Sequence, residues 1–279
     1  MTYRYGPVVV GVDGSAHSMG ALRWAADEAG RSGRTLLVVA VDPEGAGIAD
    51  LAAEEARRWR CGIAAEAQTL SGDPVEVLRE LARDARLLVV GGRGTEPGED
   101  QAMGPVSQAL ADRAEAPVLI VHAADRWAAP DATLPLSAPV VTGFDDSEAS
   151  RRALRLAFEE AAARGVHLVI VQAWTHPDLW HPGADRGGDL HAEQLAVQAA
   201  LDEAAARWKA EYPVVEVEVR SEPGDAVQAL AVASQWAGLL VVGTGCANGE
   251  SVVDGVLRHA ACPVLVAHTS SHVTSSLGT

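Results

Sequence analysis

The sequence has little of what several classes of protein depend on. Its three cysteines, Cys61, Cys246 and Cys262, are scattered and form no C-x-x-C pair. They therefore favour a reduced interior over a disulfide framework or a cysteine-rich zinc site. No apolar run reaches the roughly 18 residues of a membrane span, and the first residues contain no apolar signal region. We expect a soluble, cytoplasmic protein with no membrane partner.

Positive charge is also scarce. Lys and Arg together number 22 against 38 Asp and Glu, which gives a formal net charge of −16 at pH 7. This charge repels a nucleic-acid backbone at long range, and no basic stripe compensates for it. Nucleic acid is therefore not expected as a partner. A small nucleotide stays compatible with the composition, because local backbone amides rather than net charge hold its phosphates.

Arrangements of catalytic or metal-binding residues are equally hard to find. No Ser/His/Asp or Cys/His spacing supports nucleophilic catalysis, so we assign no catalytic residue. Several candidate metal ligands lie close together in one stretch of the second half: His176, Asp178, His181, Asp185, Asp189 and His191. The stretch contains prolines and glycines and lacks an i, i+4 histidine pair. We interpret it as a mobile polar loop and predict no metal site.

What the chain does contain is an internal repeat. Its 279 residues suffice for about two domains of ordinary size. Gly143 lies 132 residues after Gly11, within the matching apolar segments 140–145 and 8–13, and the match continues through nearly the whole chain. Each half alternates short apolar strand segments with amphipathic helix segments. That alternation predicts a parallel α/β sheet covered by helices on both faces.

The repeat sets the expected domain organisation. We predict a first domain at 1–122, a linker at 123–139, a second domain at 140–268 and a disordered tail at 269–279. In the first domain, strands are expected at 8–13, 34–41, 63–70, 87–90 and 117–121. Helices are expected after Ser15 and at 50–60, 75–84 and 106–114.

The most informative stretch follows the fourth strand of the first domain. Two residues separate Gly91 from Gly94, nine separate Gly94 from Gly104, and a helix is expected to begin directly afterwards. Glycines permit positive φ and let a polyanion approach backbone amides, while a helix N-terminus adds a partial positive charge. The spacing fits neither a P-loop nor a dinucleotide fingerprint. Taken alone, these residues leave a phosphate loop and an ordinary surface loop equally open.

In combination, these features resemble the universal stress protein family in its tandem-domain form. The similarity rests on segments 10–15, 21–25, 72–74 and 117–121 and on the glycine spacing. It implies two tandem five-stranded parallel α/β sandwiches, each with strand order 3-2-1-4-5, joined as a pseudo-twofold pair through their fifth strands. Ligands in such sheets bind where the strand order reverses, at the carboxyl ends of the first and fourth strands.

By this resemblance, the first domain is expected to bind an adenine nucleotide, ATP alone or with Mg²⁺. Asp13 would lie near the ribose and phosphates, and Val41 would contact the adenine. The residues expected to form the ATP site are Gly11, Val12, Asp13, Val41, Gly91, Arg93, Gly94, Gly104, Pro105, Val106 and Ser107. Alternatively, Asp13 could cap its own turn, and Arg93 could be a solvated loop residue.

Two positions depart from the family pattern. Pro105 stands where the family has Ser or Thr, and it lacks both an N–H and a hydroxyl that could face a phosphate. ATP binding in the first domain is therefore expected to be weakened. In the second domain the loop is shorter, and Glu250 stands where a phosphate-facing glycine would be. That domain is expected not to hold a triphosphate.

The expected function is a non-enzymatic, ATP-binding regulatory protein of the stress response, in which slow ATP hydrolysis and pairing into a homodimer stay open. The alternative is a nucleotide-free interaction module that acts through its surfaces and paired edge strands. A nucleotide-dependent ligase or pyrophosphatase is disfavoured, because residues 11–15 do not form a Ser-Gly-Gly phosphate loop.

Overall fold

A computed structural model describes residues 6–41, 47–93, 103–121, 137–174, 187–244, 246–247 and 250–268. Most of the predicted linker, residue Gly94 and the predicted tail lie outside these residues. The strands of the main sheet are β1 (Val8–Gly11), β2 (Leu36–Val41), β3 (Ala65–Leu70), β4 (Leu87–Gly91), β5 (Val118–Val121), β6 (Val140–Gly143), β7 (Leu168–Trp174), β8 (Val217–Pro223), β9 (Leu239–Gly243) and β12 (Val264–Ala267).

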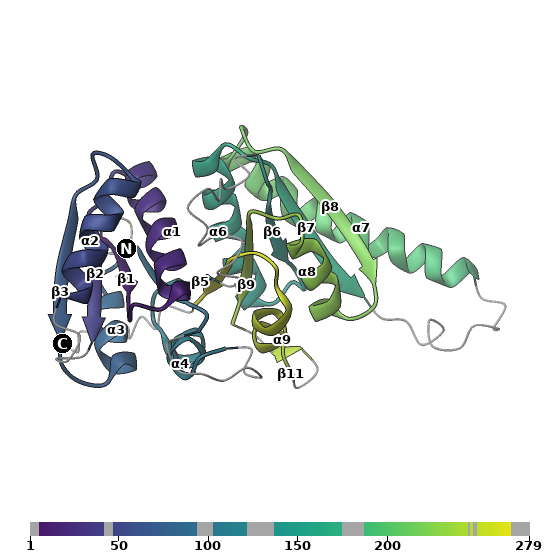
Figure 1. Ribbon diagram of the computed structural model, residues 1–279. Helices are drawn as coiled ribbons and strands as arrows, with labels where there is room; N and C mark the ends of the chain where they lie inside the picture. Colours follow the sequence, from purple (N-terminus) through teal and green to yellow (C-terminus); the bar gives the residue numbers. More distant parts are fainter. Residues whose placement is uncertain are drawn as a thin grey trace, which may run out of the picture.

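Helices cover both faces of this sheet (Figure 1). They are α1 (Ala16–Ser32), α2 (Ile48–Trp59), α3 (Pro74–Ala82), α4 (Pro105–Arg113), α6 (Glu148–Arg164), α7 (Gly187–Glu211), α8 (Ala226–Ser234) and α9 (Val252–His259). In the first half α1 packs against α2, and α3 packs against α4, so each pair forms one outer layer. Apart from the outer strands β3 and β8, the strands between the layers are largely buried, which is why they read as continuous apolar runs in the sequence.

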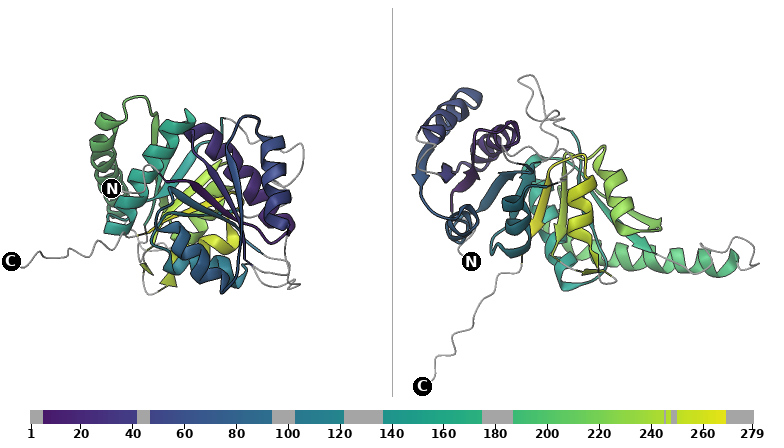
Figure 2. Two further views of the ribbon diagram at one scale, coloured as in Figure 1. Left: turned by 90° about the vertical axis from the view of Figure 1, so that its left-hand side faces the viewer. Right: turned by 60° about the horizontal axis from the view of Figure 1, so that its bottom comes forward.

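The strand order confirms the predicted fold. It runs β3-β2-β1-β4-β5-β12-β9-β6-β7-β8, so each half has the order 3-2-1-4-5 and the two halves meet at their fifth strands. Neighbouring strands are parallel throughout, except that β12 pairs antiparallel with β5. Figures 1 and 2 show the two halves side by side with this pair between them.

The junction also confirms the predicted pseudo-twofold pair. Leu119 of β5 lies opposite Leu265 of β12, and the flanking register pairs are Ile120 with Val264 and Val118 with Val266. Because β5 and β12 are equivalent strands of the repeat and run antiparallel about Leu119 and Leu265, a local twofold axis passes through this point. The apolar edges that would otherwise be open to other strands thus cover one another.

Equivalent residues cap equivalent helices in the two halves. Ser15 and Ser147 accept hydrogen bonds from the amides of Ser18 and Ser150 at the start of α1 and α6. Asp73 caps α3 in the same way, as its counterpart Asp225 caps α8. Each half therefore fixes the start of its helices with local chemistry that the sequence repeat already displays.

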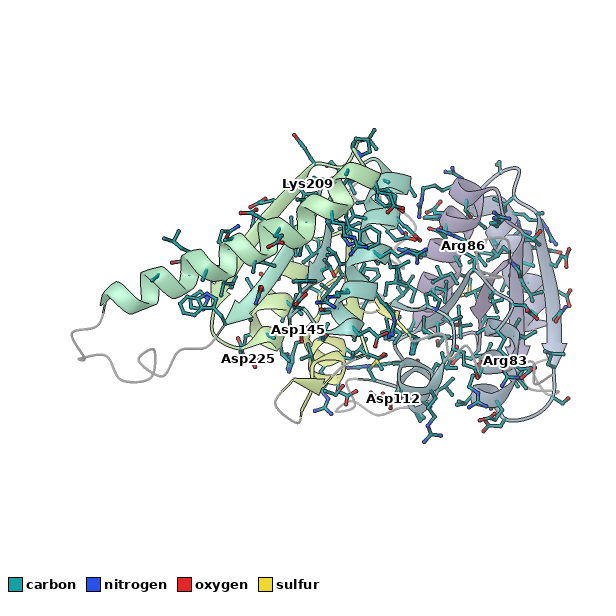
Figure 3. The ribbon with its side chains drawn as sticks, turned by 180° about the vertical axis from the view of Figure 1, so that it is seen from behind. Arg83, Arg86, Asp112, Asp145, Lys209 and Asp225 are labelled. Atoms are coloured by element: carbon teal, nitrogen blue, oxygen red, sulfur yellow. The ribbon has the colours of Figure 1, made fainter. Side chains whose placement is uncertain are left out.

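A buried ionic cluster joins the two halves beside the sheet. It consists of Glu28 and Arg31 of α1, Arg86 just before β4, and Glu160 and Arg164 of α6. The two glutamates are 1% and 3% exposed. Figure 3 shows Arg86 where the first half meets the second. Glu160 follows Glu28 by 132 residues, the same separation as that between Gly11 and Gly143. The two glutamates of the cluster are therefore equivalent residues of the repeat.

Electrostatics in the cluster favour the ionised carboxylates. Oε2 of Glu160 lies 2.9 Å from Arg164 and 3.7 Å from Arg31, and Oε1 lies 3.4 Å from Arg86. Burial alone would raise the pKa of the Glu160 carboxyl, but these three guanidiniums outweigh it and hold the pKa below its ordinary value. Burial is also the main cause that lowers the pKa of Arg31 to about 10.

One interpretation of the sequence is wrong. Asp189 and His191 belong not to a loop but to α7, a helix of 25 residues. The other four residues of the predicted polar loop lie outside the described part of the chain. Among its described side chains only Leu201 and Ala205 are buried, so this helix carries little of the apolar periodicity by which helices are recognised.

No helix in the described part of the chain combines the length and apolar character needed to cross a membrane.

Candidate nucleotide site

The turn after β1 presents the first group of predicted site residues. Gly11 ends β1, and Val12 is buried with its amide bonded to the carbonyl of Val39. Asp13 is exposed, and its Oδ1 accepts a hydrogen bond from the amide of Ser15 at 2.9 Å. Asp13 therefore does cap its own turn, which leaves its other carboxylate oxygen as the atom that could meet a ligand.

Gly91, the last residue of β4, lies against the backbone of α1. A Cβ at this position would stand 2.7 Å from the carbonyl carbon of His17 and 2.8 Å from the amide nitrogen of Ser18. Gly243 ends β9 in the second half, where a Cβ would meet the carbonyl oxygen of Ala149 at 2.3 Å. The φ of Gly91 is not in the left-handed region. Close packing of helix on strand, present in both halves, thus accounts for glycine here, and the positive φ that glycine permits is not used.

Substituting Gly91 with alanine is expected to lower the free energy of unfolding by about 1–3 kcal/mol, because the new methyl group overpacks the contact with α1. Urea unfolding followed by tryptophan fluorescence measures this loss. Arg93→Ala serves as the control, since Arg93 is exposed on the same turn and surface substitutions stay within about 0.5 kcal/mol. Equal stabilities of the two variants would show that the close contact is not rigid.

The start of α4 lies next to the end of β4. The amide of Gly104 donates to the carbonyl of Gly92 at 2.8 Å, and the hydroxyl of the buried Ser107 donates to the carbonyl of Gly91 at 2.5 Å. These bonds hold the helix start against the strand end. Because the Ser107 hydroxyl is used in this way, Ser107 can offer a ligand its backbone amide but not its side chain.

The N-terminus of α4 has no side-chain cap among the described residues. Its N-cap is Gly104, with φ −76° and ψ 153°, and Pro105 occupies the first turn. The amides of Val106 and Ser107 are therefore the groups that α4 can present to an anion. Gly104 has a backbone conformation that any residue adopts, so here too the positive φ that glycine permits is not used.

The structure brings most of the predicted site residues to one edge of the sheet. The hydroxyl of Ser15 lies 3.5 Å from the carbonyl of Arg93, which joins the turn after β1 to the turn after β4. Val41 ends β2, the neighbour of β1, at the same edge. Gly94 lies outside the described residues. Sequence reasoning missed the part that Gly92 plays in anchoring Gly104, although its place directly after Gly91 was a signal.

The equivalent edge of the second half is built differently. The turn after β6 repeats the first half closely, since Oδ1 of Asp145 accepts from the amide of Ser147 at 3.0 Å. Burial alone would raise the pKa of Asp145, but hydrogen bonds from Ser147 and Ser150 outweigh it and lower the pKa. Helix α9, in contrast to α4, is capped: the hydroxyl of Ser251 accepts from the amide of Asp254 at 3.2 Å.

The helix starts also correct the register expected from the sequence. Glu250 was placed opposite Gly104, but Gly104 and Ser251 are the two N-caps, so Ser251 is the structural counterpart. The shift arises because β10 (Cys246–Ala247) and β11 (Glu250–Ser251) form a short antiparallel hairpin ahead of α9. A serine cap, rather than an opposing glutamate, therefore closes the second helix.

Comparisons with known proteins agree with this architecture. The sequence model described as the Universal stress protein family matches residues 4–122 and 138–268. Universal stress protein Rv2005c of Mycobacterium tuberculosis is 32% identical, over 94% of this chain and 97% of its own length. Universal stress protein Rv2623 of the same organism is 33% identical, over 94% and 96%. A crystal structure of a universal stress protein from Archaeoglobus fulgidus is similar in fold, with a TM-score of 0.67 at 19% identity, over 95% of this chain and 98% of that one.

Proposed function

The chain belongs to the universal stress protein family, and we propose that it is a non-enzymatic regulator that holds one ATP, alone or with Mg²⁺, in its first half. The proposed contacts are the amides of Val106 and Ser107 for the phosphates, Asp13 for the ribose and Val41 for the adenine. Arg93, exposed beside them, would add a positive charge near the phosphates. Gly94 completes the proposed set from outside the described residues.

The observation that carries this proposal is the difference between α4 and α9. Both helices begin at the edge of the sheet where the strand order reverses, the place at which open α/β sheets bind ligands. At the start of α9 the Ser251 hydroxyl occupies the amide of Asp254, whereas α4 begins at a glycine without a side-chain cap. A helix N-terminus with open amides stabilises an anion, so the triphosphate is assigned to the first half and not to the second.

Pro105 sets the expected strength of binding. A hydrogen bond to a charged group contributes on the order of 1.5–3 kcal/mol, so losing one amide or hydroxyl contact weakens ATP binding by roughly ten- to a hundredfold. The proposal is therefore a site of moderate affinity, loaded at the high ATP concentration of a cytoplasm. The exposed Cys61 and the buried Cys262 are reduced cysteines, which fits such a reducing compartment.

The nucleotide content of the purified, unstripped protein tests the proposal. The protein is denatured and extracted, and adenine nucleotides are quantified per chain. We expect about one ATP per chain or, if it is lost during purification, thermal stabilisation on adding ATP, which reaches about 2.7 kcal/mol at a hundred times Kd. Neither nucleotide nor stabilisation at millimolar ATP would refute the ATP site and favour the nucleotide-free interaction module.

Pairing of two chains would need a surface other than the fifth strands. The edges of β5 and β12 are already joined to each other within one chain. The outer strands of the ten-stranded sheet are β3 and β8, so an interface built on strand edges would use one of these. The same limit applies to any protein partner that binds by adding a strand.

A further inference from the structure

The second half contains a cavity at the edge where its strand order reverses. The cavity has a volume of about 330 Å³ and lies at the carboxyl ends of β6, β7 and β9, between the starts of α6, α8 and α9. Small-molecule sites begin at about this size, and they favour this position in α/β sheets. Although the second half lacks an open phosphate-binding helix, it thus keeps a hollow large enough for a ligand.

The charges around this cavity disfavour an anion. Asp145 and Asp225 are the ionisable residues of its lining, which contains no arginine, lysine or histidine within the described residues. Both carboxylates lie at the same end of the second half in Figure 3. The three helices that begin at the cavity are capped by Ser147, Asp225 and Ser251, and each cap engages one leading amide, that of Ser150, Gln228 or Asp254. A phosphorylated ligand would meet two carboxylates with little to balance its charge.

The remaining lining suits a molecule with hydroxyl or amino groups on an apolar body. The carboxylate of Asp145 binds the amide of Ser147 through Oδ1, which leaves Oδ2 as an acceptor for ligand donors. Apolar side chains, among them Phe144, Leu230 and Val252, line the rest of the cavity. We propose that this crevice binds a small, uncharged, hydroxylated ligand of nucleoside size, and that it selects against phosphorylated forms of the same molecule. This site is separate from the ATP site proposed in the first half.

Adenosine, AMP and ATP form a suitable probe series, because they share an aromatic base and a vicinal diol and differ in phosphate charge. The full-length protein carries ¹³C-labelled Leu and Val methyl groups, and methyl NMR spectra follow Leu230 and Val252 during titration with each probe. We expect saturable shifts of both residues with millimolar adenosine, and binding at least about tenfold weaker for ATP. No saturable shift with adenosine, or equal shifts with ATP, would overturn the proposal.

A matched pair of variants assigns the contact to Asp145. Asp145→Asn keeps an oxygen that can accept from the Ser147 amide but removes the charge, and Asp13→Asn makes the same change at the equivalent turn of the first half. We expect adenosine to bind the second-half crevice at least about tenfold more weakly in Asp145→Asn and unchanged in Asp13→Asn. Equal affinity of the two variants at Leu230 and Val252 would refute the role of Asp145. The readout is independent of ATP binding in the first half, so failure of either proposal can be recognised separately.

Discussion

Glu160→Ala is expected to lower the free energy of unfolding by about 3–5 kcal/mol, since breaking a buried ion pair leaves its partners uncompensated. Glu160 is 3% exposed and faces the guanidiniums of Arg31, Arg86 and Arg164. Without it, Glu28 is the carboxylate that still pairs with all three guanidiniums. Because the cluster spans both halves, the loss should appear as earlier unfolding of the junction in urea, measured by hydrogen exchange of β5 and β12 together with tryptophan fluorescence.

Glu159→Ala provides the matched control for this effect. Glu159 is the next residue of the same helix and pairs with Arg155, whose side chain is largely exposed, and such surface pairs contribute about 0–1 kcal/mol. Acid supplies a second check. Because the pKa of Glu160 is lowered in the folded state from its ordinary value of 4.5, its contribution is complete above that value and is lost as the pH falls through the folded-state pKa. The stability difference between wild type and Glu160→Ala should therefore shrink in acid; a difference that stays constant, or a loss no larger than that of Glu159→Ala, would contradict the prediction.

Gly104→Ala is expected to weaken ATP binding by roughly ten- to a hundredfold, the loss of one or two hydrogen bonds to a charged ligand. The added methyl group stands at the N-cap of α4, beside the amides proposed to hold the phosphates. Isothermal titration calorimetry with ATP measures the change. The backbone conformation of Gly104 is open to alanine, so the folded structure should persist, with a stability cost of about 1 kcal/mol for the poorer cap.

Pro105→Ser tests the same helix in the opposite direction. Serine restores one N–H and one hydroxyl at the first turn of α4, and ATP affinity should rise by about tenfold. Unchanged affinity in Gly104→Ala would remove α4 from the ATP site. If only Pro105→Ser were without effect, the amides of Val106 and Ser107 would remain the contacts, and the group missing at Pro105 would be shown to point away from the phosphates.

Local patterns in the sequence were sufficient to predict the strands and most helix starts, whereas the strand order was implied by the resemblance to the family. Buried parallel strands leave continuous apolar runs, and Ser15, Asp73 and their repeats mark helix starts by their own side-chain chemistry. These features depend on neighbours in the chain. The inclusion of Asp189 and His191 in α7 was not anticipated, because their polar stretch is compatible with a loop.

Features that depend on long-range contacts could not be predicted in the same way. Nothing near Gly91 in the sequence shows that the backbone of His17 approaches within 2.7 Å of its Cβ position. Glu28 and Glu160 have the appearance of solvated helix residues until the two halves are packed together. The equivalence of Ser251 with Gly104 depends on the hairpin of β10 and β11, which forms only when the shortened loop is folded. The positions of Gly11, Asp13 and Val41 at one edge followed from topology, and their part in holding ATP stays a prediction.

The antiparallel pairing of β5 with β12 has a consequence for how the two halves can diverge. When both partners belong to one polypeptide, their association is intramolecular and does not weaken on dilution. A substitution at the junction also occurs once per pair, whereas in a dimer of identical single-domain chains it would occur twice. The buried ionic cluster shows such an asymmetry. Arg31 and Arg86 come from the first half and Arg164 comes from the second, although the glutamates they contact are equivalent in the repeat. Because the two halves belong to one chain, the second half can keep its stabilising contacts with the first while the residues at its own ligand-binding edge change to suit another ligand.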